Sequence, residues 1–249
     1  MSSWITAPSV VQAQASAMDV ADSLYAAFDN RAALAAYEAL YSGDSTSFVL
    51  LYRLARTSGD LAKDVMAEEG VRSARPLLER SVDYAERLRE LHPDRPETWF
   101  QLAVTWGTLS LSQSGREKVR IGRNVEEYAN KALRLDPSYA YAHLALGIFY
   151  REVGALNWVQ RVFANTFYGG LPEGGNEKAL RSLRRALELD PTLVMTQYEL
   201  AMTYFSMGDE PMARYHLGRA VELEPINTEE VRLQSRAAGV LAELENDNE

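Results

Sequence analysis

The residues that could do chemistry in this 249-residue chain are few and widely separated. There is no cysteine, so disulfides, a thiol nucleophile and a cysteine metal site are excluded. The three histidines are His92, His143 and His216, and none has a second histidine or clustered carboxylates at metal-ligand spacing. We therefore expect a structural role for each histidine, with no metal site and no cofactor.

Catalytic motifs are missing as well. The chain has no G-x-S-x-G, no P-loop and no G-x-G-x-x-G. Its glycine-rich turn, GGLPEGG at 169–175, lacks the lysine of a phosphate-binding loop. Carboxylates are spread along the chain without an isolated pair in an apolar setting. These features predict a protein that is not an enzyme.

Composition restricts the partners and the compartment. The net charge of −9 disfavours nonspecific nucleic-acid binding, because phosphates repel an acidic surface. No apolar run approaches the roughly 18 residues that a transmembrane segment needs. The pattern A-x-A at Ala13–Ala15 resembles the end of a secretory signal and predicts an exported or periplasmic protein. The alternative is that residues 1–18 are a flexible N-terminus and that the protein is cytoplasmic.

The remaining sequence is dominated by an internal repeat. Four segments end in a similar way at Pro93, Pro137, Pro191 and Pro225. Each proline indicates a helix end, because proline cannot donate to the helical ladder and restricts the residue before it. The spacings are 44, 54 and 34 residues, and the last equals the period of the tetratricopeptide repeat, or TPR.

Positions inside the repeats follow the TPR register. In each first helix a bulky residue, a leucine, a small residue and an aromatic recur at fixed offsets: Trp99, Leu102, Ala103 and Trp106; His143, Leu146, Gly147 and Tyr150; Gln197, Leu200, Ala201 and Tyr204. Each second helix has a small residue five positions before its proline, namely Ala132, Ala186 and Ala220. The small residues are expected where two helices cross closely.

The predicted fold is therefore all-α: a TPR-like, right-handed solenoid of four to five antiparallel helix pairs with two insertions inside repeats. Residues 19–249 are expected to form one helical domain, with its clearest repeats at 96–137, 140–191 and 194–225. Two weaker helix pairs precede them, the second with a long connection between its helices. A capping helix is expected at 228–245, with Thr228 as its N-cap.

The first insertion is a basic stretch that contains Arg116, Lys118, Arg120 and Arg123. It could contact an anionic partner, but a solvated helix face or loop is the favoured interpretation, since runs of charge usually lie at the surface.

The second insertion, at 154–175, has the pattern of an amphipathic helix followed by the glycine-rich turn. Its distinctive residues are Trp158, Arg161, Phe163 and Phe167. A helix with one apolar face needs a cover, which could be the array's own surface, a ligand or a membrane. Packing within the molecule is favoured.

The TPR register also predicts an unusually apolar concave groove. Its residues are Phe100, Val104, Tyr141, Leu144, Ile148, Met195, Tyr198, Met202 and Phe205, with Arg151 at the edge. The insertion, a protein partner or an apolar ligand could cover this groove. Cover by the insertion is preferred, because it accounts for both apolar surfaces.

The region from Tyr84 to Leu244 resembles the regulator of microtubule dynamics family of TPR-like proteins. The resemblance is carried by Leu146, Gly147, Tyr150, Val153, Leu156, Trp158, Arg161, Phe167, Gly169 and Pro172, whereas Asn157 and Gln160 depart from the family's serine and glutamate. It implies the architecture and a binding role. It does not imply the membrane anchor, mitochondrial targeting or microtubule association of the animal members.

Two functions remain open at this point. The first is a non-enzymatic scaffold or adaptor that binds a protein or peptide partner on the concave face, with Arg151 holding a polar or carboxylate end. The alternative is a small-molecule or transport-accessory binding protein whose groove is closed by the insertion. The TPR-like component of periplasmic uptake systems is similar in scaffold to that alternative.

Overall fold

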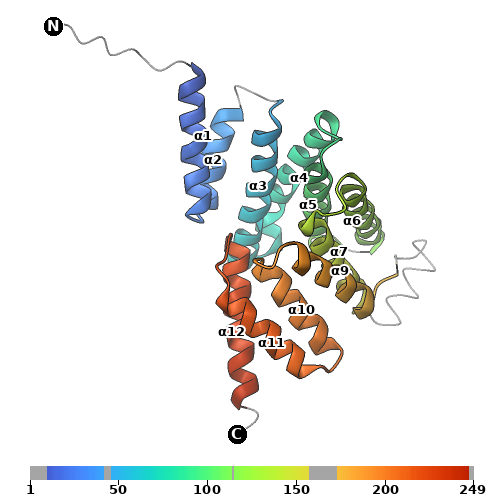
Figure 1. Ribbon diagram of the computed structural model, residues 1–249. Helices are drawn as coiled ribbons and strands as arrows, with labels where there is room; N and C mark the ends of the chain where they lie inside the picture. The colour runs from blue at the N-terminus through green and yellow to red at the C-terminus, as the bar shows by residue number, and fades with distance from the viewer. Residues whose placement is uncertain (1–9, 42–45, 114, 157–172, 247–249) are drawn as a thin grey trace, which may run out of the picture.

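The computed structural model describes residues 10–41, 46–113, 115–156 and 173–246, and every regular element within those ranges is a helix (Figure 1). Five helix pairs and a final helix follow one another. They are α1 (Val10–Ala26) with α2 (Asn30–Tyr41), α3 (Phe48–Glu69) with α4 (Val71–Leu91), α5 (Pro96–Ser110) with α6 (Gly115–Leu135), α7 (Ala140–Gly154) with α9 (Asn176–Leu189), α10 (Val194–Ser206) with α11 (Glu210–Glu222), and α12 (Thr228–Asn246). The predicted all-α solenoid is confirmed.

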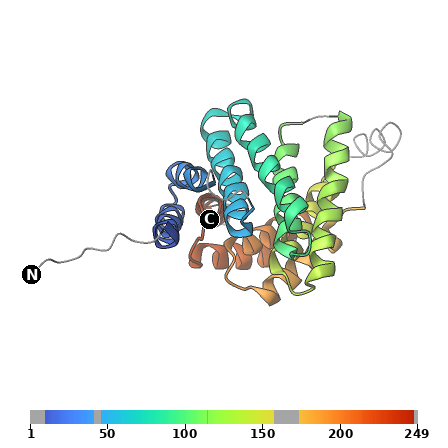
Figure 2. The same ribbon diagram turned by 90° about the horizontal axis from the view of Figure 1, so that it is seen from above.

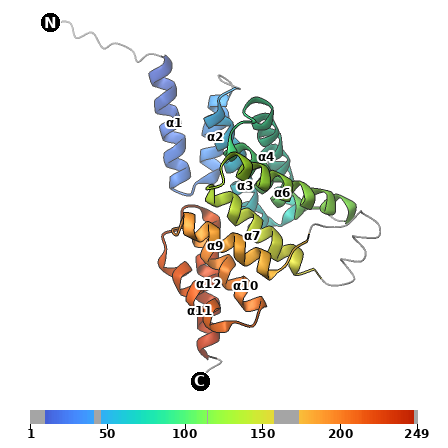
Figure 3. The same ribbon diagram turned by 45° about the vertical axis from the view of Figure 1, so that its right-hand side comes forward.

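Small residues lie at the helix crossings, as the register requires. Ala103, Ala132, Ala186, Ala201 and Ala220 are each at most 1% exposed. At Gly147 the approach is closest, because a Cβ there would lie 2.5 Å from the Cγ and Cδ2 atoms of Leu183 on α9. The pairs then stack along the chain, with α7, α9, α10 and α11 in succession (Figure 3).

The second helix pair differs from the prediction. A long connection was expected, but α3 continues for 22 residues and only Gly70, at φ 89°, separates it from α4. The segment 61–69 is helical because Leu61 and Val65, four positions apart, both bury their side chains in the core. The expectation of a long connection was wrong, because residues 61–69 are mostly good helix formers such as alanine, leucine, lysine, methionine and glutamate.

The first insertion lengthens α6 to 21 residues, compared with 14 in α9. Its basic side chains Lys118, Arg120 and Arg123 are exposed, and Arg120 is paired with Glu117 at 2.5 Å. The side chain of Arg116 lies outside the described part. The stretch is thus a charged helix face, the interpretation that the sequence favoured.

The described residues that flank the second insertion, at the end of α7 and the start of α9, lie close together. Its ends touch: the Gly175 N–H donates to the Tyr150 carbonyl at 2.9 Å, and a Cβ on Gly154 would lie 2.7 Å from the Gly175 Cα. Gly174 is equally confined, because its Cβ would meet the Cβ of Val153 at 2.6 Å. Only glycine allows two backbones to approach this closely.

The four residues singled out in that insertion, Trp158, Arg161, Phe163 and Phe167, lie outside the described residues. Cover of the groove by this segment therefore stays a prediction. At the other end of the chain, α1 begins at Val10, so the Ala13–Ala15 pattern lies within a helix rather than in an irregular lead-in.

The first helices of the second to fifth pairs, α3, α5, α7 and α10, form a ring with α12. Along the solenoid α3 contacts α5, α5 contacts α7, α7 contacts α10, and α10 contacts α12. The ring closes because α12 also contacts α3, whose C-terminal end meets the start of α12 (Figures 1 and 2). We call the side of these helices that faces the middle of the ring the inner face. The ring is closed because α12 contacts both α3 and α10.

Candidate protein-binding site on the inner face

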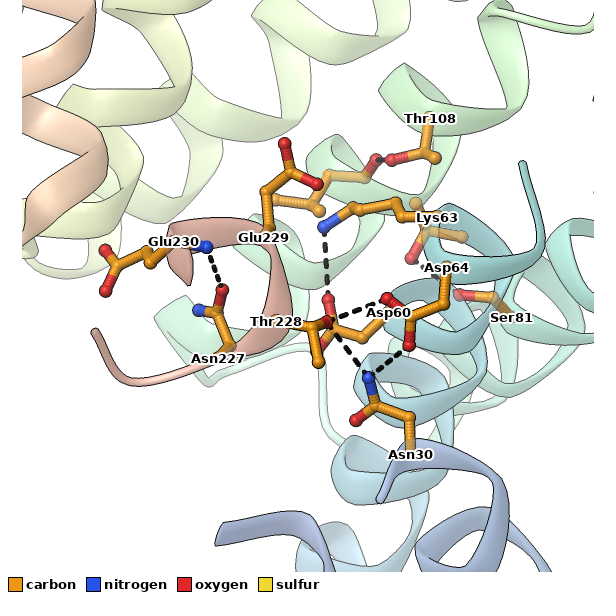
Figure 4. Close-up of polar contacts among 12 residues, drawn as sticks. Asn30, Asp60, Lys63, Asp64, Ser81, Thr108, Asn227, Thr228, Glu229 and Glu230 are labelled. Carbon is orange, nitrogen blue, oxygen red and sulfur yellow. Dashed lines mark hydrogen bonds and ion pairs between the residues drawn. The ribbon is translucent and has the colours of Figure 1, made fainter. Parts of the chain in front are cut away.

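A cluster of polar contacts closes the ring between α2, α3 and α12 (Figure 4). The Asp64 carboxylate accepts hydrogen bonds from Asn30 Nδ2 at 2.7 Å and Thr228 Oγ1 at 2.9 Å, and it pairs with Arg232 at 2.7 Å. Arg232 is held in place by a second carboxylate, Glu229, also at 2.7 Å. We call Asn30, Asp64, Thr228 and Arg232 the closure cluster. It joins residues that are up to 198 positions apart.

The first turn of α12 supports this closure. Thr228 was predicted as the N-cap, but Asn227 takes that role, since its Oδ1 accepts from the Glu230 N–H at 2.9 Å. Thr228 is thereby left to bond Asp64. Glu230 is 1% exposed and accepts from the backbone N–H groups of Met195 and Ile226 at 3.2 and 3.0 Å. Burial raises the pKa of Glu230.

The predicted groove residues divide into two sets. In the C-terminal half, four side chains pack on an apolar cluster to which α12 contributes Leu233 and Ala237; these four are Met195, Tyr198, Met202 and Phe205. Leu144 is only 5% exposed, and Ile148 packs beside it on the core between α7 and α9. These residues pack on the protein's own core, as Tyr141 does too, and Ile148, Met195, Tyr198, Met202 and Phe205 are half-buried.

The edge residue Arg151 is also engaged. Its guanidinium pairs with Glu199 at 2.7 Å and with Glu152 at 3.0 Å. Burial raises the pKa of Glu199, although Arg151 acts against this rise. The carboxylate that Arg151 was expected to take from a partner is thus supplied by α10.

In the N-terminal half, the predicted groove residues form a half-buried aromatic cluster. Phe100 on α5, with Tyr139 and Tyr141 at the start of α7, form a triangle whose ring centroids are 5.5, 5.5 and 5.8 Å apart. All three residues are half-buried. Val104, one turn after Phe100, is half-buried as well.

Three residues of α1 and α3 extend this surface. Tyr52 and Tyr139 each influence the pKa of the other, so they are neighbours, and the Arg56 guanidinium lies 5.9 Å from the centroid of the Tyr52 ring. The same guanidinium stacks on Tyr25 at 3.9 Å from the ring centroid. We call Tyr25, Tyr52, Arg56, Phe100, Tyr139 and Tyr141 the aromatic–arginine site.

The hydroxyl groups of this site remain protonated at neutral pH. Burial raises the pKa of Tyr25, Tyr52 and Tyr139 well above that of free tyrosine. The Tyr25 hydroxyl donates to Asp60 at 2.7 Å. Neutral phenols let aromatic rings bury their apolar faces while their hydroxyls keep hydrogen bonds.

Arg56 differs from the other inner-face cations because its guanidinium carries no hydrogen bond or ion pair within the described ranges. Its Nε atom is buried and without a partner there. Asp60, the acid four residues on, is already bonded to Tyr25 and to Lys63 at 3.1 Å. Burial acts to lower the pKa of Arg56, but its neighbours, Asp60 among them, raise it above the ordinary value, so the guanidinium is charged at neutral pH.

A second buried atom near the site also lacks a partner. The Oε2 atom of Glu97, in the first turn of α5, has no hydrogen bond from the described residues. Its charge contributes to the raised pKa of Tyr52 and of Tyr139, after burial. Other buried side-chain oxygens without a partner among the described residues are those of Thr57, Ser58, Glu86 and Thr196, so this feature is not confined to the inner face.

The sequence indicated Phe100 and Tyr141 but missed the other four members of this site. Arg56 and Tyr52 are four residues apart on one face of α3, a spacing that the sequence shows. The repeat register does not identify them, because α3 precedes the three repeats that share it.

The histidines hold structural positions, as expected. Nε2 of His143 lies 3.0 Å from the Pro137 carbonyl, and Nε2 of His92 lies 2.9 Å from the Thr46 carbonyl. His216 is 5% exposed, with Nδ1 2.7 Å from Gln197 Oε1 and its ring stacked on Tyr204. The described residues contain no group of three or more ligands that could hold a metal ion.

His216 should make stability depend on pH. Burial lowers its pKa to about 4, so the unfolded chain, at about 6.5, binds a proton first as pH falls. Protonation then favours unfolding, and about 2 kcal/mol should be lost between pH 7 and pH 5. Urea unfolding at the two pH values should show this loss in wild type and in His143→Gln, but not in His216→Gln. An equal loss in all three would contradict this assignment.

Two hollows of about 390 and 310 Å³ lie apart from this site. The first is lined by the connection from α11 to α12, including Leu223 and Ile226. The second adjoins the closure cluster and is lined by Phe28, Leu61 and Asp64 among others. Neither includes a residue of the predicted groove.

Among the described helices, none is both long enough and apolar enough to span a membrane.

Comparison with known sequences gives one family. The sequence model of the family "Regulator of microtubule dynamics protein 1-3" matches residues 17–245. Regulator of microtubule dynamics protein 1 from Mus musculus is 26% identical over 201 residues, which cover 78% of this chain and 64% of the relative. The Pongo abelii protein is 26% identical, with coverage of 82% and 65%. The chain thus spans somewhat less than two thirds of these relatives.

Solved structures with a similar fold are TPR proteins and related factors. A thermophilic TPR protein from Thermus thermophilus superposes with a TM-score of 0.69 at 22% identity, covering 92% of this chain and 99% of that one. PilW, a type IV pilus biogenesis factor, gives 0.56 at 18% identity, with coverage of 93% and 87%. These similarities establish the fold.

Proposed function

The chain belongs to the regulator of microtubule dynamics protein 1-3 family, and from this premise we propose that it is a non-enzymatic scaffold that binds a protein partner on its inner face. The observation that carries the proposal is the half-buried triangle of Phe100, Tyr139 and Tyr141. Clustered aromatic rings from two successive repeats are of the kind that protein interfaces use as an anchor point.

The mechanism is burial of an apolar side chain of the partner against these rings. Each fully buried large apolar side chain contributes roughly 1.5–3 kcal/mol. The surface is preorganised, because the closure cluster fixes α3 relative to α12 and little ordering is left to occur on binding.

A scaffold is favoured over a small-molecule carrier by the position of the hollows. A carrier needs a cavity along the groove, and the two best-formed hollows among the described residues lie elsewhere, at the α11–α12 connection and at the junction of α2, α3 and α12. An enzyme is disfavoured because the histidines are occupied by structural contacts.

Replacing Tyr141 by glutamate should abolish partner binding, since a charge would be buried against Phe100. Proteins captured from the source cells by wild type and lost with Tyr141→Glu are purified, and their affinity is measured by calorimetry. We expect at least a roughly 100-fold loss. Tyr215→Glu is the control, because Tyr215 is 59% exposed on the outer helix α11.

Retained affinity in a folded Tyr141→Glu protein would refute the proposed site. Tyr141→Ala, which introduces no charge, separates a lost contact from a disturbed fold. Its melting temperature should stay within a few degrees of wild type, since the ring is half-buried.

A further inference from the structure

The junction of α3 with α12 differs from the other junctions of the ring in what holds it together. Buried apolar clusters join α3 to α5, α5 to α7, α7 to α10 and α10 to α12. Among the described residues, no apolar cluster contains side chains of both α3 and α12. Hydrophobic burial therefore stabilises the curve of the solenoid but not its closure.

Polar contacts hold this junction instead (Figure 4). Asp64 of α3 pairs with Arg232 of α12 and accepts a hydrogen bond from Thr228, and Arg232 also pairs with Glu229. The side chains of Asp64 and Arg232 are 18% and 25% exposed, so dissolved ions can reach the pair. Ion pairs that are open to solvent stabilise weakly, and salt weakens them further.

Packing at this junction is also incomplete. The hollow of about 310 Å³ lies between the two helices and is lined by Leu61 and Val65 of α3 and by Thr228 and Arg232 of α12, among others. Closely packed protein interfaces contain few voids of that size. The two helices are thus held at a few polar points, and their separation would expose little apolar surface that the fold now buries.

We propose that the closure cluster is an ionic clasp, at which the ring opens and exposes the inner face while the apolar core of the solenoid stays intact. Its apolar side chains keep α12 on α10 and α11, so the movement is a change of angle spread over the repeats. This inference rests on the proposed function, because an open ring gives a polypeptide partner access to the inner face.

The test measures the distance across the junction by electron paramagnetic resonance. The chain contains no cysteine, so spin labels at Ala67→Cys and Ser235→Cys, exposed positions one turn beyond Asp64 and Arg232, report on α3 and α12 alone. Raising KCl from about 0.1 M to about 1 M shortens the Debye length from about 10 Å to about 3 Å. The fraction of molecules with a longer distance should then rise at least about threefold.

Matched variants separate opening of the clasp from other effects. Asp64→Ala should populate the longer distance already at low salt, whereas Glu79→Ala, which breaks an exposed ion pair on α4, should behave as wild type. Labels at Met207→Cys, after α10, and Ser235→Cys should keep one distance at both salt concentrations, because α12 stays on its apolar core. A distance between positions 67 and 235 that does not change with salt, or a change between positions 207 and 235, would overturn the proposal.

Binding kinetics distinguish this inference from the proposed function. If access to the inner face requires opening, the captured partner should associate at least about threefold faster with Asp64→Ala than with wild type at low salt. An unchanged association rate of a partner that is lost with Tyr141→Glu would refute the clasp alone. A partner that is unaffected by Tyr141→Glu would refute the proposed function itself.

Discussion

Replacing Gly147 by leucine should lower the free energy of unfolding by about 3 kcal/mol. Gly147 lies where α7 crosses α9, and even a Cβ would lie 2.5 Å from two side-chain atoms of Leu183 and 3.3 Å from its backbone nitrogen. Leu183 is fully buried and cannot move aside without disturbing the core of that repeat. The added side chain must therefore separate the two helices.

The matched control for this change is Gly239→Leu. Gly239 lies in α12, where a Cβ would meet nothing within 4 Å, so the better helix propensity of leucine should leave stability equal or slightly higher. Urea unfolding of both variants makes the comparison. Equal midpoints for Gly147→Leu and Gly239→Leu would show that the assigned repeat register is incorrect.

Replacing Asp64 by alanine should cost about 2 kcal/mol and loosen the ring. The change removes the acceptor shared by Asn30, Thr228 and Arg232, and Asn30 is only 4% exposed, so its amide loses a partner that water cannot readily replace. Hydrogen exchange should become faster in the first turns of α12, where the closure cluster holds the helix.

Glu79→Ala is the control for the loss of a carboxylate. Glu79 pairs with Arg75 on the surface of α4, where both side chains are more than half exposed, and such pairs contribute little. A Glu79→Ala protein as unstable as Asp64→Ala, or unchanged exchange in α12 of Asp64→Ala, would show that the closure cluster does not hold the ring.

The repeat could be predicted from local signals that do not depend on tertiary context. Prolines mark the helix ends, and the small residues Ala103, Gly147 and Ala201 are required by helix crossings that are equivalent in every repeat. The length of α3 could not be predicted in the same way. Its last turns, which contain Leu61 and Val65, are helical because they pack in the core, and that packing depends on distant parts of the chain.

The site was harder to predict than the fold, because its composition depends on which partners lie within reach. Arg151 and Arg56 both belong to the inner face, and nothing in the sequence near them shows that Glu199, 48 residues away, pairs with Arg151. The closure cluster joins Asp64 to Thr228, a separation of 164 residues. Contacts at such distances follow from how the solenoid curves, which is set by the sum of small angles between repeats.

The proposed site also accounts for two features that stability alone leaves unexplained. A fold is not stabilised by a buried Arg56 Nε or Glu97 Oε2 without a partner, because each lost its hydrogen bond to water. Arg56→Gln removes the cation that stacks on Tyr25 at 3.9 Å, and Glu97→Gln removes a carboxylate from the first turn of α5. Both changes are expected to lower partner affinity.

The most direct measurement is site-specific photocrosslinking with the purified partner. A benzophenone-bearing residue is introduced at position 141, on the inner face, or at position 215, on the outer helix α11. If the inner face is the binding surface, the partner becomes covalently attached at position 141. Attachment at position 215 with none at position 141 would contradict the account.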